Sequence, residues 1–497
     1  MVFPSCNSCF VGLNLLFKPL GLRPSKELAV SGRYLKVHAP EHRVIDCYEV
    51  GDVIGQGAFG TVSLARSRQC ATDCVLKVMG KDDVLDDAKL VDEVNIHAAL
   101  DHPNIVRIYE AFVNESQLSI VMEFCRGGAL SAVVESKGGV CSEAEARHVF
   151  GQVIRAVHHM HCQSFAHRDL KLENFLVKEF DLSLLQCTIK LTDFGLAARF
   201  EAGKASFKTI CGSPDYMAPE VFTSAPYKYN EKCDVWSCGV ILYTLLSGEM
   251  PFSGGSIAEL IRNLKARPVY FSPHAWKSVP SDAQSLVRRT CCKVVAERLS
   301  TEQVLADAWL TAPEVQAEKH PSAVLTSAML AHAEVFSEMS PWQRAMLHRI
   351  AYRMPDEQIS SLREIFLQLD SDGDGKLSEQ EWLQGASQAK LSAQEHSRLS
   401  NLFSQLISDA SAVLEYTEFL AAMTCHQPKM SKETCMATFQ CFDTDWEGTI
   451  SAQKIRQVLV QDGLDEGGAG PLEEILRCWD IDGDGTIPFA EFMKTLI

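Results

Sequence analysis

The stretch His167-Arg168-Asp169-Leu170-Lys171-Leu172-Glu173-Asn174 decides the fold of this 497-residue chain. The tripeptide Asp193-Phe194-Gly195 begins 24 residues after Asp169, and Ala218-Pro219-Glu220 follows it. Each of these motifs is short, but a chance match of all three in this order is negligible. The segments on either side are therefore expected to belong to the same folded unit.

A glycine-rich segment lies upstream, Gly55-Gln56-Gly57-Ala58-Phe59-Gly60-Thr61-Val62, between two apolar stretches. Glycines let backbone N–H groups approach phosphates closely, because no Cβ stands in the way. A dinucleotide-binding turn has similar glycines, but it requires a helix directly after them. Thr61-Val62-Ser63-Leu64-Ala65 has the pattern of a second strand, which favours a phosphate-binding loop between two strands.

Lys77 and Glu93 provide a candidate ion pair for the same loop. Lys77 lies in Cys74-Val75-Leu76-Lys77-Val78, a predicted third strand, from which it can reach the α- and β-phosphates. A carboxylate must hold such a lysine, and Glu93 lies on the next predicted helix. Either residue alone is more often an ordinary surface charge, but their shared context predicts a pair.

These motifs together resemble the protein-kinase family, and the resemblance covers residues 48–310. It implies an α+β bilobal protein-kinase fold and transfer of the ATP γ-phosphate to protein serine or threonine. By this resemblance Asp169 accepts the substrate hydroxyl proton, Lys171 lies against the γ-phosphate, and Asn174 and Asp193 hold Mg²⁺. The implied ATP-binding residues are Ile54, Gly55, Gln56, Gly57, Ala58, Phe59, Gly60, Thr61, Val62, Lys77, Glu93 and Glu123.

The same resemblance assigns supporting roles to other residues. Glu220 is expected to pair with Arg298, and Asp234 is expected to brace the catalytic loop. The stretch 178–186 is expected to form a surface insertion. Thr209 is the candidate for activation-loop phosphorylation, and an unmodified threonine remains equally open.

Charge is distributed unevenly along the chain, whose net charge is −17. From Asp356 to the end there are 10 Lys/Arg and 25 Asp/Glu, a net charge of −15. Such a module argues against nucleic acid as a partner and suits a cation binder. The 18 cysteines are dilute and lack zinc-finger spacing, which predicts reduced thiols and a cytoplasmic protein.

The first 47 residues have no clear period and are expected to be a loosely ordered extension. Within it, residues 10–17 are apolar but too few to span a bilayer. A weak membrane-surface anchor, a poor targeting signal and a segment packed on the kinase all remain open. Val2 excludes N-myristoylation, which needs glycine at that position.

Two acidic loops in the last third meet every requirement for Ca²⁺, namely acids at positions 1, 3 and 5, Gly at 6, a carbonyl at 7 and Glu at 12. They are Asp370–Glu381 and Asp480–Glu491. The predicted ligands are Asp370, Asp372, Asp374, Lys376 and Glu381 in the first, and Asp480, Asp482, Asp484, Thr486 and Glu491 in the second.

Two further loops of the same length are degraded. The loop 407–418 keeps Glu418 but has Ile407 at position 1 and Ala412 at the glycine position, so we expect it to be structural. The loop 443–454 ends in Lys454, a cation where the bidentate carboxylate belongs. Its weak Ca²⁺ candidates are Asp443, Asp445, Glu447 and Thr449.

With four such loops the resemblance sharpens to the calcium-dependent protein kinases of plants and protozoan parasites. The expected domains are an extension 1–47, a kinase domain 48–310, an autoregulatory junction 311–355 and an EF-hand domain 356–497. ATP, Mg²⁺ and Ca²⁺ are the implied cofactors, protein substrates the implied partners, and a monomer the expected state.

The junction is the predicted switch. Ser340-Pro341-Trp342-Gln343 can cap a helix in which Trp342, Met346 and Ile350 share one face. The family resemblance implies that the junction blocks the kinase without calcium and that the sensor captures it with calcium. A mere packing helix, a constitutive kinase with partner-binding EF-hands, and a calcium-regulated pseudokinase scaffold are the alternatives.

Overall fold

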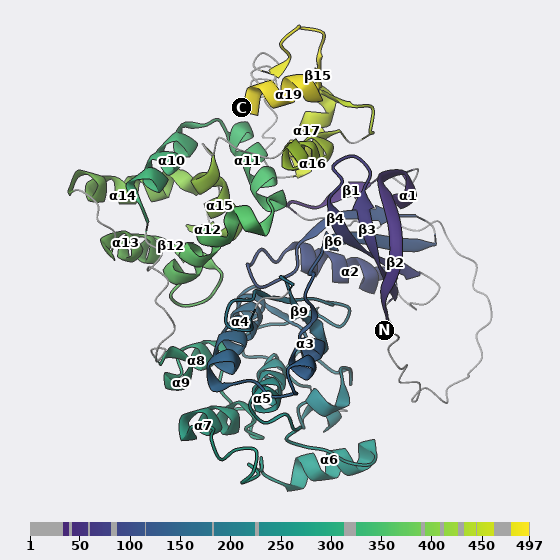
Figure 1. Cartoon of the computed structure of the whole chain (residues 1–497), viewed down its shortest axis with the longest axis vertical. Coiled ribbons are helices and arrows are strands. Elements are labelled where there is room, and N and C mark those ends of the chain that lie inside the picture. The colour runs from purple at the N-terminus through teal and green to yellow at the C-terminus, as the bar shows by residue number, and fades with distance from the viewer. Residues whose placement is uncertain are drawn as a thin grey trace.

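The computed structural model describes residues 33–38, 42–57, 60–80, 87–114, 116–180, 183–223, 228–312, 325–388, 393–407, 412–425, 432–443, 445–461 and 479–496. The expected two-lobed α+β domain followed by an all-α region is confirmed (Figure 1). No helix in these ranges combines the length and the apolar character that crossing a membrane requires.

The N-terminal lobe is a six-stranded sheet in the order β1-β5-β6-β4-β3-β2. The strands are β1 (Lys36–His38), β2 (Tyr48–Gly57), β3 (Gly60–Ser67), β4 (Asp73–Gly80), β5 (Ile108–Val113) and β6 (Gln117–Glu123), with helices α1 (Val44–Cys47) and α2 (Asp87–Ala98). The glycine-rich turn joins β2 and β3 at one edge of the sheet, and β1 forms the other edge. Ala58 and Phe59 lie outside the described residues.

The expectation that residues 1–47 form a loosely ordered extension is wrong for the described part. Residues 36–38 form β1, which pairs in parallel with β5, and residues 44–47 form α1. A three-residue strand is too short to show a period in sequence, and its partner lies some seventy positions away, in the pairing of Lys36 with Glu110. Residues 1–32 lie outside the described ranges.

The C-terminal lobe is mainly helical. Its helices are α3 (Leu130–Ser136), α4 (Glu143–Cys162), α5 (Lys232–Ser247), α6 (Ile257–Ala266), α7 (Ser281–Thr290), α8 (Thr301–Leu305) and α9 (Ala308–Thr311), with 3-10 turns η1 (Leu172–Asn174), η2 (Pro214–Tyr216) and η3 (Val221–Thr223). Short strands β7 (Gly128–Ala129), β8 (Phe165–Ala166), β9 (Phe175–Val177), β10 (Ile189–Leu191) and β11 (Ala198–Arg199) carry the catalytic segments. The central helices α4 and α5 are buried along most of their length, so they form a rigid base for these segments.

The last third forms helices around paired loops. The helices are α10 (Ser327–Glu338), α11 (Pro341–Arg353), α12 (Asp356–Leu369), α13 (Glu379–Gln388), α14 (Ala393–Leu406), α15 (Tyr416–Thr424), α16 (Lys432–Phe442), α17 (Ala452–Gln461) and α19 (Phe489–Leu496). Strands β12 (Lys376–Ser378) and β13 (Val413–Glu415) join the first two loops, and β14 (Thr449–Ser451) and β15 (Thr486–Pro488) join the last two. The elements from α12 onward therefore form two EF-hand pairs, and α10 and α11 precede them.

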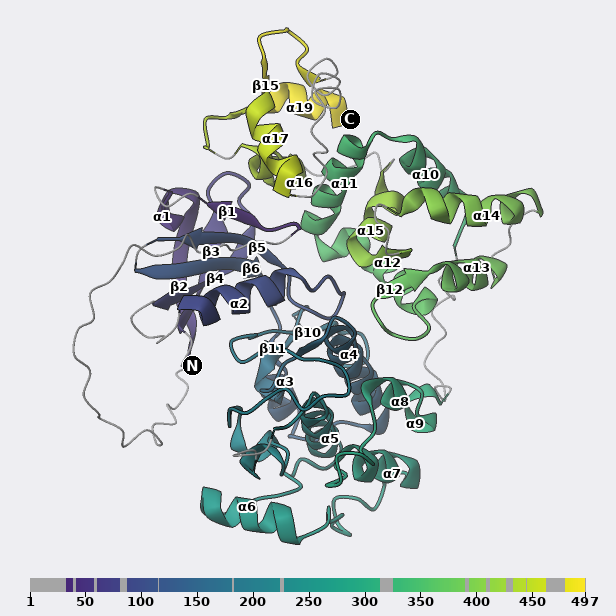
Figure 2. The same cartoon turned by 180° about the vertical axis from the view of Figure 1, so that it is seen from behind.

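Helix α11 lies between the two pairs (Figures 1 and 2). Met346 packs with Phe439 and Phe442 of the second pair, whereas Ile350 packs in the core of the first pair. Met346 and Ile350 lie one turn apart on the predicted helix, but they pack against different EF-hand pairs, because this helix is clasped from two sides. The side chain of Trp342 lies outside the described residues.

Candidate functional site

The glycine-rich hairpin brings backbone close to the strand that carries Lys77. Gly60 has φ of +129°, and a Cβ there would lie 2.1 Å from the carbonyl oxygen of Val78. Only glycine fits this close approach. Lys77, in the middle of β4, donates to Glu93 Oε1 of α2 at 2.7 Å and to Asp193 Oδ1 at 3.0 Å. The structure thus brings together three residues that were predicted from separate motifs.

Electrostatic attraction keeps Lys77 and Asp193 charged. Burial alone would lower the pKa of the Lys77 ammonium, but Glu93 and Asp193 outweigh it and raise that pKa. Burial would likewise raise the pKa of Asp193, yet Lys77 holds it below its ordinary value. Asp193 also has φ of +65°, a left-handed conformation that is strained for a non-glycine residue and typical of functional sites.

The catalytic loop collects its predicted residues around Asp169, which is buried. Asn174 donates its amide to the Asp169 carbonyl oxygen at 2.8 Å, and Lys171 Nζ lies 3.2 Å from Asp169 Oδ2. The backbone N–H of Ser213 donates to Asp169 Oδ1 at 2.7 Å, and Lys171 donates to the Ser213 hydroxyl at 3.0 Å. A carboxylate, an ammonium and an amide therefore converge on one point of the cleft.

Asp234 of α5 holds the catalytic loop through hydrogen bonds to its backbone. Its two carboxylate oxygens accept the backbone N–H groups of His167 and Arg168, each at 2.8 Å, and the ring of His161 at 2.9 Å. Burial would raise the pKa of Asp234, but these donors hold it lower. Arg168, fixed by this contact, has φ of +65°.

The expected pair between Glu220 and Arg298 is present near the catalytic loop. The Glu220 carboxylate accepts N–H groups from both terminal guanidinium nitrogens of the buried Arg298, at 2.5 and 2.9 Å, in a bidentate pair. Arg168 faces the Leu196 carbonyl oxygen at 2.7 Å and the ring of Phe207 at 4.8 Å. The carbonyl oxygen of Thr209 accepts the Tyr229 hydroxyl at 2.7 Å.

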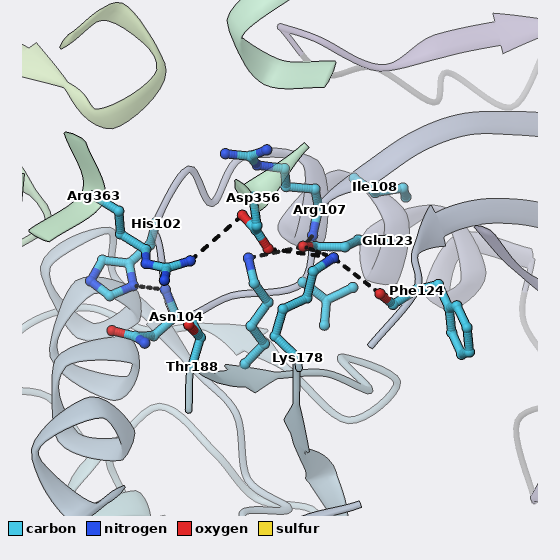
Figure 3. A network of polar contacts seen from close by, with 12 residues as sticks. His102, Asn104, Arg107, Ile108, Glu123, Phe124, Lys178, Thr188, Asp356 and Arg363 are labelled. Carbon is cyan, nitrogen blue, oxygen red and sulfur yellow. Dashed lines mark hydrogen bonds and ion pairs between the residues drawn. The ribbon is translucent and has the colours of Figure 1, made fainter. Parts of the chain in front are cut away.

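Glu123 ends β6, and its buried carboxylate is held by basic side chains and a backbone N–H. It contacts Lys178 Nζ at 2.7 Å and Lys190 Nζ at 3.0 Å and accepts the Arg107 backbone N–H at 3.2 Å (Figure 3). Burial would raise its pKa, but the two lysines hold it well below its usual value. A contact between this residue and adenine would therefore use its main chain.

The loop Asp370–Glu381 gathers the first predicted set of calcium ligands. Oxygens of Asp370, Asp372 and Asp374 lie within 4.8 Å of one another. Burial and then the neighbouring acids raise the pKa of Asp370 to about 8 and of Asp374 to about 6. Glu381 accepts the Ser371 and Ser378 backbone N–H groups at 2.8 and 2.9 Å. Clustered carboxylates of this kind fit a divalent cation that neutralises them.

The loop Asp480–Glu491 gathers the second predicted set of calcium ligands. Oxygens of Asp480, Asp482 and Glu491 lie within 4.8 Å of one another. Asp480 accepts the backbone N–H of Gly485 at 2.8 Å, and Asp484 accepts that of Thr486 at 2.7 Å. These bonds turn the loop so that its oxygens face inward.

Comparisons with known proteins agree with both halves of the molecule. A family model described as "Protein kinase domain" matches residues 48–310, one described as "EF hand" matches 362–385, and one described as "EF-hand domain pair" matches 463–496. The chain is 33% identical over 463 residues to calcium-dependent protein kinase 12 of Arabidopsis thaliana, covering 91% of this chain and 90% of that protein. The chain belongs to the calcium-dependent protein kinases.

Other relatives span the two groups of organisms in which the resemblance placed it. Calcium-dependent protein kinase 34 of Arabidopsis thaliana is 31% identical over 92% of this chain and 85% of its own length. Calcium-dependent protein kinase 5 of Plasmodium falciparum (isolate 3D7) is 29% identical over 91% and 78%. This calcium-dependent protein kinase is thus a calcium-regulated serine/threonine kinase that uses ATP with Mg²⁺ and acts on proteins.

In this calcium-dependent protein kinase the junction contacts the kinase at the β1–β5 edge of the sheet, opposite the glycine-rich hairpin. The Tyr352 hydroxyl of α11 donates to the Ile108 carbonyl oxygen at 3.0 Å and accepts the Ile108 N–H at 3.3 Å. Arg353 lies 3.2 Å from the buried Glu110 carboxylate. The junction helix is therefore held on the kinase by an ion pair as well as by hydrogen bonds.

The first EF-hand pair also contacts both lobes. Thr417 of α15 donates its N–H and hydroxyl to Asp101 at 2.8 and 2.9 Å. Asp356, at the start of α12, lies 3.4 Å from Lys178, with Arg363 beside it at 3.7 Å (Figure 3). Lys178 belongs to the stretch expected as a surface insertion, and this lysine is largely buried against the sensor instead.

The degraded loops each hold a basic side chain. Arg33 donates to Glu418 Oε1 at 2.7 Å and to Glu415 Oε2 at 2.9 Å, at the end of the second loop. Lys454 lies 2.9 Å from Asp443 in the third loop. Nothing in the sequence around Arg33 marks it as a partner of the second loop, whereas the lysine at position 12 of the third loop is a visible signal.

Proposed function

We propose that calcium activates this kinase by holding α11 in the position that the structure describes, between the two EF-hand pairs and against β5. Leu347 and Ile350 are buried in the first pair, and Ala345 and Met346 in the second. A helix clasped in this way is not free to lie across the catalytic cleft. This double clasp is the observation that supports the proposal.

The calcium-free state is the other half of the switch. The EF-hand pairs lose the cations that neutralise their acidic clusters, and the loops then no longer hold the helices in the clasping arrangement. The released junction, residues 311–355, blocks the kinase, as the family resemblance implies. Access of the protein substrate to the cleft is therefore the regulated step.

Within the cleft, we assign the reactive roles by contact geometry. Asp169 takes the proton of the serine or threonine hydroxyl as that oxygen attacks the γ-phosphorus. Lys171, beside Asp169, neutralises charge that develops on the γ-phosphate, and Lys77, fixed by Glu93, orients the α- and β-phosphates.

Asn174 and Asp193 are the residues that would hold Mg²⁺. The Asn174 amide N–H is already committed to Asp169, which leaves its oxygen for a cation, and the Asp193 carboxylate is kept ionised by Lys77. Bound Mg²⁺ supplies positive charge that neutralises the phosphate oxygens. The alternative of a pseudokinase scaffold is disfavoured, because each of these groups is in place.

We propose further that the enzyme is monomeric and cytoplasmic, and that its macromolecular partners are proteins rather than nucleic acids. The acidic last third supports the exclusion of nucleic acid. Unpaired thiols among the described residues, such as Cys162 and Cys292, support a reducing compartment. The membrane-surface hypothesis concerns residues 10–17, which lie outside the described residues.

The decisive experiment measures ³²P transfer from Mg-ATP to a generic serine peptide, with EGTA or with micromolar free Ca²⁺. Wild type should transfer phosphate with Ca²⁺ and lose most of the activity in EGTA, and Asp193→Ala should be inactive in both. Equal rates with EGTA and Ca²⁺ would support a constitutive kinase. Absence of transfer in every condition would support the scaffold.

A second measurement tests which loops carry the calcium response. Glu381→Gln and Glu491→Gln each remove an anionic ligand, so each should shift the activation midpoint to about tenfold higher Ca²⁺ or more. Glu379→Gln, in the first loop but at a position that is not a ligand, is the matched control and should leave the midpoint unchanged. A shift of equal size in the control would contradict the assignment.

A further inference from the structure

The third EF-hand loop holds an ammonium group at the position where a calcium ion would lie. Lys454 Nζ lies 2.9 Å from Asp443 Oδ1 and 2.7 Å from the Thr449 carbonyl oxygen, and it contacts Asp445 Oδ1 directly. Glu447 Oε2 is 3.9 Å away. These four residues are loop positions 1, 7, 3 and 5, the positions that ligate calcium in a competent loop. The three N–H donors of the ammonium thus have three close acceptors.

The lysine is well suited to act as a resident cation. Its side chain is only 8% exposed. Its ammonium group is enclosed by the Asp443 and Asp445 carboxylates and by the Thr449 carbonyl oxygen. Because this ammonium group is part of the chain, it neutralises part of the acidic cluster without an ion having to bind from solution.

The loop has the same backbone turn as the two competent loops. The N–H of Gly448 donates to Asp443 Oδ2 at 2.9 Å, as Gly375 does to Asp370 at 3.1 Å and as Gly485 does to Asp480 at 2.8 Å. All three glycines have φ between +80° and +87°. The third loop therefore adopts the arrangement of a calcium loop without needing the ion.

The outer surface of the same loop rests on the N-terminal lobe. Trp446, at position 4, stacks on His38 of β1 with ring centroids 5.7 Å apart, and Lys36 Nζ lies 4.3 Å from its ring. Lys36 also donates to the carbonyl oxygens of Gln440 and Asp443, at 2.6 and 3.3 Å. Asp443 is loop position 1, so Lys454 of the loop and Lys36 of the kinase strand both contact this residue.

We propose that the third EF-hand is a calcium-independent anchor: Lys454 fills the loop in place of the ion and thereby keeps Trp446 docked on β1 whether or not calcium is bound. The second EF-hand pair then stays on the N-terminal lobe in the resting enzyme. The inference goes beyond the switch proposed above and does not depend on it, because it concerns a contact that calcium does not control.

The first test counts calcium ions on the full chain by equilibrium dialysis. Wild type should bind two, one for each competent loop. Lys454→Glu restores a carboxylate at position 12, so it should bind three. Three ions on wild type, or two on Lys454→Glu, would overturn the assignment of Lys454 as the resident cation.

The second test follows hydrogen–deuterium exchange of residues 36–38 and 110–113 in EGTA. Wild type should protect both segments, and Lys454→Met, which leaves the acids without a cation, should exchange about tenfold faster or more. Lys432→Met, an exposed lysine of α16, is the matched control and should exchange like wild type. Equal protection in Lys454→Met and wild type would overturn the anchor.

Trp446→Ala separates docking from folding of the loop, in case Lys454→Met disrupts the second pair. This variant keeps the Lys454 contacts, so its calcium count should stay at that of wild type. Protection of residues 36–38 in EGTA should nevertheless be lost. Retained protection in Trp446→Ala would show that the third loop does not anchor the sensor. None of these readouts requires kinase activity, so they can fail while the switch stands.

Discussion

Asp234 is buried in α5, yet both of its carboxylate oxygens face the catalytic loop. They accept two consecutive backbone N–H groups, those of His167 and Arg168, directly before Asp169. The position of Asp169 thus depends on a residue that does not contact the substrate. Because Arg168 is held in a left-handed conformation, losing these acceptors should let the loop relax.

Asp234→Asn tests this dependence. The amide nitrogen of asparagine cannot accept an N–H, so one of the two backbone donors loses its partner, at a cost of about 1–3 kcal/mol. We expect kcat to fall about tenfold or more with KM for ATP nearly unchanged, together with a lower melting temperature. Asp282→Asn, at an exposed position of α7, is the matched control. Wild-type kcat in Asp234→Asn would show that the loop holds its own shape.

The buried His97 makes the stability of the folded protein sensitive to acid. Burial lowers the pKa of His97 to about 4, while its ring contacts the Val106 carbonyl oxygen at 2.6 Å. The unfolded chain protonates this residue near its ordinary pKa of about 6.5. The stability from neutral His97 is therefore complete above about pH 6.5 and is lost as the pH falls toward 4, by about 1.4 kcal/mol per pH unit.

Melting temperatures of wild type and His97→Gln at pH 7.5 and pH 5.5 measure this contribution. Wild type should lose more stability between the two pH values than the variant, because glutamine does not titrate. The calcium ligands contribute equally to both proteins and cancel in the comparison. His274→Gln, at an exposed position, should behave as wild type does. An identical pH dependence for wild type and His97→Gln would contradict the assignment.

Among the helices, α11 contacts both EF-hand pairs and the kinase domain. It contacts α15 of the first pair, α16 of the second pair and β5 of the kinase. The contact with β5 is made by Tyr352, whose hydroxyl serves both the N–H and the carbonyl of Ile108. This one hydroxyl completes the hydrogen bonding of a buried residue of the sheet.

Tyr352→Phe keeps the ring and removes both hydrogen bonds, which leaves buried backbone groups of Ile108 unpaired at a cost of about 2 kcal/mol. The docked state should lose about 30-fold in its equilibrium constant. If docking of α11 accompanies activation, activity at a given subsaturating Ca²⁺ should fall several-fold. Tyr270→Phe, an exposed tyrosine, is the matched control. Unchanged calcium dependence in Tyr352→Phe would separate this contact from activation.

The chemical motifs could be predicted from sequence, because the residues that meet in the cleft are each marked by their local context. Lys77, Asp169 and Asp193 come from three segments, and the structure places Lys77 against Asp193 and gathers Lys171 and Asn174 around Asp169. The two competent calcium loops were readable for the same reason, since all their ligands lie within twelve consecutive residues.

The docking surface could not be predicted, because no local pattern marks it. Asp101 meets Thr417 across 316 positions of the chain, and Glu110 meets Arg353 across 243. The two partners of α11 could not be predicted, because helical spacing reports which residues align but not how many partners surround them. Strand β1 was missed for a related reason, as its three residues become a strand only by pairing with β5.

At the scale of the whole molecule, the first EF-hand pair lies beside both lobes of the kinase (Figure 2). Its calcium loop takes part in this contact directly. The carbonyl oxygen of Asp374 lies 2.7 Å from His159 Nδ1 of α4. A Cβ on Gly375 would lie 2.5 Å from the same ring atom and 2.6 Å from His102, so the loop backbone is seated closely on the C-terminal lobe.

Two sites that share one backbone segment influence each other reciprocally. If the calcium-bound loop docks better on the kinase, then the kinase contact must raise the calcium affinity of that loop by the same factor. His159→Ala removes the partner of the Asp374 carbonyl and leaves all the predicted calcium ligands intact. We expect the calcium affinity of the first loop to fall about threefold to tenfold, measured by equilibrium dialysis on a Glu491→Gln background that weakens the fourth loop. His274→Ala should match the background protein. Unchanged affinity in His159→Ala would mean that the contact with the kinase and the binding of calcium are independent, and the sensor would then act on the enzyme through α11 alone.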